Sequence, residues 1–351
     1  MNKKRKTVFV GMSGGVDSSV SAALLKKQGF DVIGVFIKTW HPNFIKCNEE
    51  EERRDAMRVA AFLDIPFLTF DLEEVYKKQV ADYMISEYKA GRTPNPDVMC
   101  NKEVKFGAFM KKSLEMGADY VATGHYAQNI KNNLVKAKDP SKDQVYFLWT
   151  LNKKLLSKII FPVGNLNKTE VRKLASKFKI PVAEKKDSQG ICFLGAVDLK
   201  DFLKHYIKEK RGKVLNEKGE EIGFHDGAVF HTLGERHGFT ITKKKTDSKP
   251  FYIIKKDIKK NILYVSNSPE NLSQKNNLYK LESLNWINSM PKVNKKYTAQ
   301  IRYHGEFLNC RIKKLNKNKA EINFEKEILV AAGQSCVFYD KNVCLGGGVI
   351  V

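Results

Sequence analysis

Two cysteines of this chain lie in polar sequence rather than in apolar runs. Cys100 follows a proline-rich stretch, "TPNPDVMCNKEVKF" (93–106), and Cys192 lies in "KKDSQGICFLG" (185–195). Lysines close to a thiol favour its reactive thiolate form, and the prolines predict an extended or turned backbone before Cys100. A buried, unreactive thiol is the usual state of a cysteine in reducing surroundings. On these residues alone, both interpretations stay open for each cysteine.

A glycine-rich turn, "GMSGGVDSSV" (11–20), joins the first apolar segment to the first helical one. Gly14 and Gly15 allow a tight turn and a close approach of the backbone to a phosphate, and N–H groups at the helix start point toward such an anion. Asp17 is expected to order the loop or a magnesium ion. Because the turn matches neither the Walker A pattern nor the dinucleotide fingerprint, an ordinary strand–helix turn is the alternative.

The first half of the chain alternates apolar strand patterns with amphipathic helix patterns, which predicts a doubly wound parallel α/β sheet. Ligands of such sheets bind beyond the carboxyl ends of the strands. One helix carries a capping box formed by Asn167 and Glu170. We expect strands at 7–12, 31–40, 66–72 and 118–126. We expect helices at 18–30, 49–65, 73–92, 105–117 and 167–180.

After about residue 205, short alternating runs separated by Gly, Asn, Asp and Lys turns predict two smaller β-rich domains. The expected domains are 1–205, 206–275 and 276–351. The expected strands lie at 227–233, 251–257, 261–266, 296–303, 308–315, 320–325 and 335–340.

The net charge of +23 favours an acidic partner such as nucleic acid. Only 10 of the 62 basic residues are Arg, so the codon bias of an AT-rich genome is an alternative source of the lysines. Six cysteines without a CxxC pair indicate neither a disulfide framework nor a structural zinc site, and we expect no dedicated metal site. With no apolar run of about 18 residues, we expect no membrane span. The cysteine usage favours the reducing cytoplasm, and a monomer is the default expectation.

The hexapeptide Ser-Gly-Gly-Val-Asp-Ser (13–18) resembles the PP-loop of ATP pyrophosphatases, which split ATP into AMP and pyrophosphate. Further motifs follow in the order found in tRNA-uridine 2-sulfurtransferases, the tRNA-specific 2-thiouridylases, over residues 7–351. These motifs are "GRTPNPDVMCNKEVKF", "ATGHYA", "KDQVYFLWTL", "FPVGNLNKTEVRKLA", "KKDSQGICFLG", "HTLGERHGF" and "GQSCVFYD".

The resemblance implies an ATP-dependent exchange of the 2-oxygen of the wobble uridine for sulfur. AMP is transferred to O2 and pyrophosphate departs, with Mg²⁺ screening the phosphates. Cys192 is implied to carry a persulfide whose outer sulfur attacks C2. Cys100 is implied to attack that persulfide and form a transient disulfide with Cys192, or to release sulfide. Asp97 is implied to act as acid or base beside the flipped-out uridine.

The resemblance also implies two sets of binding residues. The ATP contacts are Gly11, Met12, Ser13, Gly14, Gly15, Val16, Asp17, Ser18, Ile37 and Gly124. The contacts with tRNA or its target base are Asn95, Pro96, Asp97, His125, Lys142, Asp143, Gln144, Arg302, Tyr303 and Gln334. Without the resemblance, His125 could equally be a core or capping histidine. The chain departs from the family in "HTLGERHGF", where Glu235 and His237 reduce the positive charge and put a phosphate contact in doubt.

The implied partners are tRNA, with Lys, Glu and Gln acceptors expected, and a cysteine desulfurase acting directly or through a sulfur carrier. Three alternatives are a PP-loop ligase for a small carbonyl substrate, a non-catalytic RNA-binding protein and a thiol redox protein. A small-molecule ligase would need neither two thiols nor basic β-domains. A non-catalytic RNA-binding protein would be expected to lack Asp17 or one of the cysteines. A thiol redox protein would be expected to contain a CxxC pair.

Overall fold

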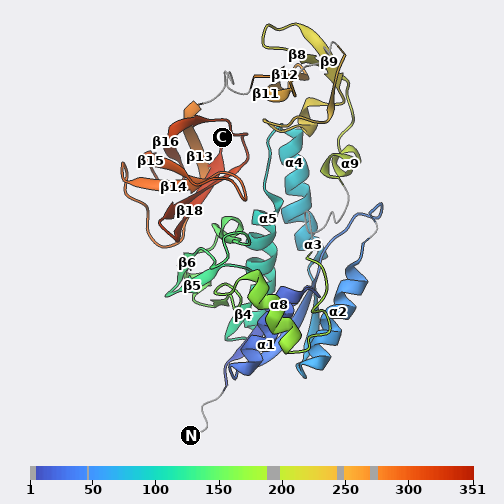
Figure 1. Ribbon diagram of the computed structural model, residues 1–351, viewed down its shortest axis with the longest axis vertical. Helices are drawn as coiled ribbons and strands as arrows, with labels where there is room; N and C mark the ends of the chain where they lie inside the picture. Colours follow the sequence, from blue (N-terminus) through green and yellow to red (C-terminus); the bar gives the residue numbers. More distant parts are fainter. Residues whose placement is uncertain (1–4, 46, 188–197, 243–248, 269–275) are drawn as a thin grey trace.

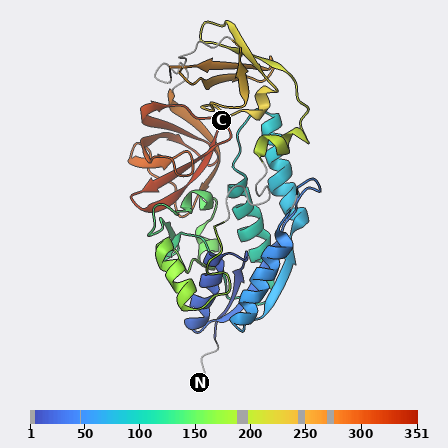
Figure 2. The ribbon, with the colours of Figure 1, turned by 45° about the vertical axis from the view of Figure 1, so that its right-hand side comes forward.

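The computed structural model describes residues 5–45, 47–187, 198–242, 249–268 and 276–351. A parallel-sheet domain forms one end of an elongated molecule, and a small antiparallel-rich sheet lies at the opposite end (Figure 1). A β-barrel lies alongside, and it stays next to both of the other parts in the turned view (Figure 2).

The N-terminal sheet has five parallel strands in the order β3-β2-β1-β4-β7. This confirms the doubly wound parallel sheet. The central β1 is apolar and buried because helices cover both faces of the sheet. The strands are β1 (Thr7–Gly11), β2 (Asp31–Lys38), β3 (Phe67–Asp71), β4 (Tyr120–Ala122) and β7 (Ile159–Ile160).

The five expected helices are present, one of them shifted in position, and two short helices at 153–156 and 199–204 were not expected. The helix expected to begin at 105 instead begins at Pro96, and a π-helical stretch, η2 (Cys100–Phe109), continues it. The expected helix 73–92 also contains a π-helical stretch, η1 (Lys77–Asp82). The α-helices are α1 (Val16–Lys27), α2 (Glu49–Phe62), α3 (Glu73–Tyr76), α4 (Tyr83–Lys89), α5 (Pro96–Met99), α6 (Met110–Glu115), α7 (Lys153–Leu156), α8 (Lys168–Lys177) and α9 (Leu199–Lys204).

The second sheet has the strand order β10-β9-β8-β12-β11. The strand expected at 227–233 is wrong, because Ala228–Phe230 forms a 3₁₀ turn, η4. There the Ala228 N–H donates to the Asn261 side chain at 2.9 Å instead of to a strand. The strands are β8 (Gly212–Leu215), β9 (Glu221–His225), β10 (Phe239–Ile241), β11 (Tyr252–Asp257) and β12 (Ile262–Ser266).

The third sheet closes into a barrel because β13 pairs with both β16 and β18. The strand expected over 296–303 ends at Gln300, where the chain turns through His304 with a φ of 56°. The barrel strands are β13 (Asn276–Trp286), β14 (Lys296–Gln300), β15 (Leu308–Leu315), β16 (Ala320–Ile328), β17 (Ser335–Asp340) and β18 (Val343–Ile350).

A hairpin from the N-terminal half extends the barrel sheet. It consists of β5 (Gln128–Ile130) and β6 (Asn133–Val135), and β6 pairs with β18 at Val135 and Val343. Lys131 and Asn132 have φ values of 52° and 61°, which is the backbone of a two-residue hairpin turn. The barrel is therefore joined to the N-terminal domain through a shared sheet.

The segment that leads into the Cys100 helix contacts both β-domains. The Thr93 N–H donates to the carbonyl of Ala332 at 2.8 Å, and the Thr93 hydroxyl lies 3.1 Å from that of Thr232. The Lys256 ammonium of β11 donates to the carbonyls of Gly91 and His231. Residues 91–93 thus lie where all three domains meet, and they fix the start of the helix that carries Cys100.

Lys256 makes this junction sensitive to pH. Burial lowers the pKa of Lys256 to about 8 from its usual 10.5, against the opposing effect of Glu235. Between pH 8 and 10.5 the unfolded chain holds this proton while the folded chain does not. The free energy of unfolding contributed by Lys256 therefore rises with pH across this window, by about 3 kcal/mol at most. Thermal unfolding should show the melting temperature of the wild type rising relative to Lys256→Met between pH 7.5 and 9.5. A constant difference between the two proteins contradicts this prediction.

Within the parts of the chain that the structure describes, none of the helices combines the length and the apolar composition that crossing a bilayer requires.

Candidate active site

The glycine-rich loop lies at the carboxyl end of β1 and leads into α1. Gly15 is the N-cap of α1, and no side chain caps the helix start. The Ser18 hydroxyl folds back on the loop, accepting from the Ser13 N–H at 3.2 Å and donating to the Gly15 carbonyl at 3.2 Å. N–H groups at the start of an α-helix point outward and favour an anion. The loop therefore has the shape and polarity that a phosphate group requires.

Gly14 is required for this loop conformation. Its φ is +72°, and a Cβ built on it would lie 2.3 Å from the backbone oxygen of Glu52 in α2. We expect Gly14→Ala to raise the KM for ATP at least about tenfold, because the loop must move away from α2. Gly29→Ala is the matched control, since Gly29 also has a positive φ (+87°) but open space around it. This control should lower the melting temperature while leaving the KM unchanged. Equal KM values for the two variants would exclude a role of the loop in ATP binding.

Asp17, in the first turn of α1, is held by two side chains. It accepts hydrogen bonds from the Tyr126 hydroxyl at 2.8 Å and from the Lys168 ammonium at 2.7 and 2.9 Å. Lys168 is the first residue of α8, its side chain is 14% exposed, and it also pairs with Asp187 at 2.8 Å. These bonds tie the first turn of α1 to the segment after β4 and to the start of α8.

Asp187 forms salt bridges with three cationic side chains: Lys168, Lys142 at 2.9 Å and Arg172 at 2.7 Å. Burial acts to raise the pKa of Asp187, but hydrogen bonds from Lys168 and Lys142 outweigh burial and lower this pKa to about 2. The sequence patterns did not single out Lys168, Tyr126 or Arg172 as functional residues. The capping box of Asn167 and Glu170 was the only local signal near Lys168, because it marks Lys168 as the first residue of a helix.

The segment that follows β4 connects the loop to the Cys100 helix. A Cβ on Gly124 would lie 2.7 Å from the backbone nitrogen of Ser18, so Gly124 packs directly on the start of α1. This explains why the strand expected over 118–126 ends at Ala122. The next residue, His125, lies beside η2, where the centroid of its ring is 5.9 Å from that of the Phe106 ring.

His125 is a buried histidine, 7% exposed, with Nδ1 2.7 Å from the Thr123 hydroxyl. Burial, assisted by the charge of Lys105, lowers the pKa of His125 well below its usual value. The imidazole is therefore neutral at pH 7. This environment matches the core or capping alternative, and a contact of His125 with tRNA stays a prediction.

Cys100 is buried, at 5% exposure, and opens η2. The extended or turned backbone expected before Cys100 is wrong from Pro96 onward, where the chain is helical. Pro96 lies at the start of α5, where a missing N–H costs nothing. The Asn95 side chain caps this helix by accepting from the Val98 N–H at 3.2 Å. The proline-rich stretch is a helix start that holds Cys100 at a fixed position.

Asp97 lies one helical turn before Cys100. Burial raises the pKa of the Asp97 carboxyl, and Lys105 partly opposes this shift. Beside them, Asn101 is 4% exposed and donates through its amide to the Asp97 carbonyl at 3.0 Å. Among the described residues, the Asn101 Oδ1 is buried without a hydrogen-bond partner. A raised carboxyl pKa and an unused buried acceptor are features of a site that receives a polar ligand.

The barrel contributes Tyr303 to this region. The centroid of the Tyr303 ring lies 4.4 Å from the centroid of the Phe147 ring. Burial raises the pKa of Tyr303, with the charges of Asp143 and Asp97 adding to the effect. Arg302 is exposed, and its guanidinium donates to the Leu233 carbonyl at 3.5 Å. Asp97 and Tyr303, 206 residues apart in the sequence, thus lie within electrostatic range of each other.

Four further residues singled out in the sequence contact other parts of the protein or are buried in it. Gln144 accepts from the Tyr126 N–H at 2.9 Å, so it supports the residue that holds Asp17. Ile37 lies inside β2 rather than after it, paired with Phe70. Gln334 has a buried Oε1 without a partner among the described residues. In the turn 233–238, Glu235 pairs with the buried His231 at 3.3 Å.

Cys192 and its pairing with Cys100 lie outside the described residues, so the disulfide stays a prediction. Within the described ranges, no three His, Cys, Asp or Glu side chains are grouped so that they could hold a metal ion.

Three family profiles match this chain in succession. The profile described as the tRNA methyl transferase HUP domain matches residues 6–196, the tRNA methyl transferase PRC-barrel domain matches 200–267, and the aminomethyltransferase beta-barrel domain matches 276–350. These profiles describe the same order of architectures as the structure, with a parallel-sheet domain first and two β-domains after it.

Curated relatives match over nearly the whole length. The chain is 43% identical to the tRNA-specific 2-thiouridylase MnmA of Geobacillus thermodenitrificans, covering 98% of this chain and 94% of the relative. It is 42% identical to the enzyme of the same name from Bacillus subtilis, with the same two coverages. The domain profiles carry a methyl transferase name, whereas these full-length relatives are named thiouridylases. Because the relatives span all three domains, the chain belongs to the tRNA-specific 2-thiouridylase family.

Proposed function

We propose that this protein uses ATP to replace the 2-oxygen of the wobble uridine of tRNA with sulfur. In the first step the uridine O2 attacks the α-phosphate of ATP, which forms an O2–AMP bond and releases pyrophosphate. In the second step a persulfide sulfur attacks C2, and AMP leaves with the oxygen. The products are 2-thiouridine, AMP and pyrophosphate.

The observation that carries this proposal is the double contact made by residues 123–126. Gly124 packs on the start of α1 and Tyr126 donates to Asp17, while His125 contacts the helix of Cys100. An enzyme that adenylates a base and then thiolates it needs its nucleotide loop and its cysteine on two sides of one substrate. A short rigid connection between them supplies that arrangement.

In this proposal the loop 11–18 binds the phosphates of ATP through backbone N–H groups, and Lys168 adds a positive charge beside them. Ile37 and Gly124 line the rest of the nucleotide site. Because the Asp17 carboxylate is already occupied by Lys168 and Tyr126, we propose that Mg²⁺ is held by the triphosphate rather than by a cage of side chains.

Asp97, with its raised pKa, is proposed to hold and move the proton at the uracil ring while O2 is activated. Asn95 and Pro96 position it. The terminal sulfur of a Cys192 persulfide attacks C2, and the Cys100 thiolate attacks the inner sulfur. A Cys100–Cys192 disulfide forms and the sulfur stays on C2. A cysteine desulfurase, directly or through a carrier, supplies the persulfide, and a cellular thiol reduces the disulfide.

The test is a reconstituted reaction with unmodified glutamate tRNA, ATP, cysteine and a cysteine desulfurase. We expect AMP, pyrophosphate and 2-thiouridine to form together and only when tRNA is present. AMP without 2-thiouridine would keep the ATP chemistry but refute the sulfur transfer. The absence of tRNA-dependent AMP from folded protein would refute the proposal as a whole.

A further inference from the structure

A recess lies between the N-terminal domain and the barrel. This cavity has a volume of about 510 Å³, within the range of sites for small molecules. One wall is the loop after β6, with Lys136, Ala137, Lys138, Pro140 and Asp143. The other wall comes from the barrel, with Gln300, His304, Gly305, Phe307 and Asn342.

Both walls are fixed by hydrogen bonds that do not use the cavity. The Lys136 N–H donates to the carbonyl of Asn342 at 2.9 Å, which links the two domains at the floor. The Asp143 carboxylate accepts from the Ala137 N–H at 3.0 Å, which shapes the loop. The Gln300 amide donates to the Gly305 carbonyl at 3.0 Å and shapes the barrel turn. The cavity is therefore built into the junction of the two domains.

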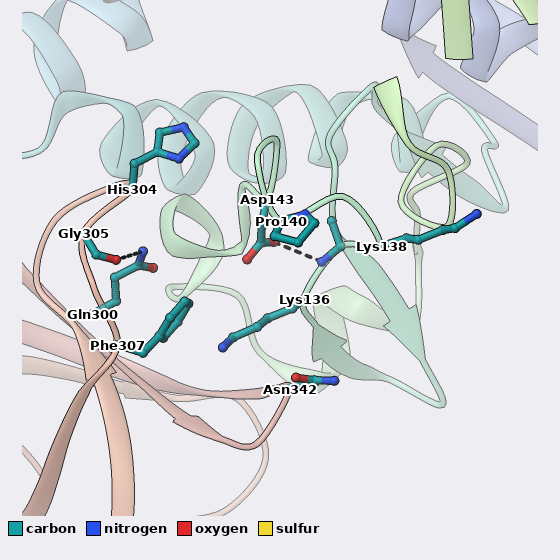
Figure 3. Close-up of a pocket in the computed structure, with 10 residues that line it drawn as sticks. Lys136, Lys138, Pro140, Asp143, Gln300, His304, Gly305, Phe307 and Asn342 are labelled. Carbon is teal, nitrogen blue, oxygen red and sulfur yellow. Dashed lines mark hydrogen bonds between the residues drawn. The ribbon is translucent and has the colours of Figure 1, made fainter. Parts of the chain in front are cut away.

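Four polar side-chain groups of the lining have no hydrogen-bond partner among the described residues: the Lys136 ammonium, the second carboxylate oxygen of Asp143, the Asn342 side-chain amide and the His304 imidazole. The Lys136 ammonium lies 3.3 Å from the centroid of the Phe307 ring and 4.7 Å from that of Tyr339. Figure 3 shows Lys136 pointing toward Phe307, with Asp143 and Asn342 on either side of it. The set offers a cationic donor, an anionic acceptor and an amide that both donates and accepts.

This combination suits the edge of a nucleobase better than a phosphate. Lys138 points away from the other lining residues in Figure 3 and is paired with Glu170 at 3.0 Å, so Lys136 is the lysine that faces the cavity. The Asp143 carboxylate, on the same wall as Lys136, would repel an anion. A neutral base presents donors and acceptors side by side and also packs on an aromatic ring such as Phe307.

The location connects this cavity to RNA. Asp143 lies between Lys142 and Gln144, and His304 directly follows Tyr303, so both walls continue segments that we assign to tRNA contact. We propose that this cavity receives the base of a second, unstacked nucleotide of the tRNA, distinct from the uridine that is modified. This inference rests on the proposed function, because it requires tRNA to be the substrate.

The test pairs tRNAs carrying a single abasic nucleotide, at each anticodon-arm position except the target, with variants of the cavity. For one position, we expect the missing base to weaken binding to the wild type roughly tenfold, the order expected for one base–aromatic contact. The same missing base should change binding less than twofold in Phe307→Ala and Asn342→Ala, because the contact is already lost there. Phe307 and Asn342 are exposed, and equal melting temperatures would verify that both variants fold.

Two lysine variants test whether the abasic effect belongs to the cavity. Lys313→Met removes a charge from an exposed position of β15 and should leave every abasic effect as in the wild type, whereas Lys136→Met should remove the effect at the one position. If every abasic effect persists in the cavity variants while the wild type still binds and thiolates tRNA, the cavity inference is wrong and the proposed function stands. Saturable binding of free uridine or adenosine monophosphate that Phe307→Ala removes, without any abasic effect, would also overturn it. A wild type that does not bind tRNA refutes the proposed function itself.

Discussion

Replacing Cys100 by serine is expected to reduce 2-thiouridine formation to below about 0.1% of the wild-type rate. Serine is nearly isosteric with cysteine, and the helix start around position 100 is fixed by the Asn95 cap and by contacts of the preceding residues with both β-domains. The fold should therefore survive. A hydroxyl at this position is neither ionised at neutral pH nor able to form a disulfide, so the step that frees the sulfur from Cys192 cannot occur.

The distinguishing measurement separates adenylation from thiolation. Cys100→Ser and Cys192→Ser should both still release pyrophosphate in a tRNA-dependent first turnover, because the loop that binds ATP is intact. Cys47→Ser is the control, since Cys47 is exposed, and it should thiolate at the wild-type rate. Normal 2-thiouridine formation by Cys100→Ser would show that this thiol is not used, and normal formation by Cys192→Ser would refute the persulfide assignment.

The second large effect is expected at Lys168. Its ammonium lies between the carboxylates of Asp17 and Asp187. Lys168→Met leaves both carboxylates facing each other beside the phosphate site, where they repel the triphosphate. We expect kcat/KM for adenylation to fall by roughly 10²–10³-fold, the usual cost of losing one charge-stabilising group in an active site.

Stability should fall as well, by about 1–3 kcal/mol. That is less than for a fully buried pair, because the side chains of Asp17 and Asp187 remain 30% and 34% exposed. Lys173→Met on the same helix is the matched control, since Lys173 is exposed, and it should change neither quantity. Lys168→Arg should recover part of the adenylation rate. If Lys168→Met loses stability but keeps the wild-type KM for ATP and the wild-type adenylation rate, Lys168 only anchors α8 and takes no part in nucleotide binding.

Local patterns predicted the parts of this fold that depend on near neighbours. The parallel sheet follows from apolar runs alternating with amphipathic helices, and the capping box of Asn167 and Glu170 is present at the start of α8. The strands expected at 308–315 and 335–340 have the bounds of β15 and β17. In each case the side chains that determine the element lie within a few residues of one another.

The parts that were missed depend on contacts distant in sequence. Lys168 reaches Asp17 across 151 positions, and no pattern around either residue specifies that pairing. The β5–β6 hairpin joins a barrel whose strands begin at residue 276. Its place in that sheet depends on pairing with β18, more than 200 residues away in the sequence. The polar neighbours of Cys100 left open whether its thiol is buried. Cys100 belongs to a core cluster that also contains Phe230 and Val337, one residue from each β-domain, and that burial cannot be deduced from the local sequence.

In the proposed reaction, ATP activates the uridine oxygen, which then leaves with AMP. The most direct measurement uses a substrate tRNA labelled with ¹⁸O at O2 of the target uridine, followed by mass spectrometry of the AMP and of the digested RNA. We expect each 2-thiouridine formed to be matched by one AMP carrying ¹⁸O in its phosphate. Formation of 2-thiouridine with unlabelled AMP would contradict it, because the oxygen would then have left by a route that does not pass through the α-phosphate.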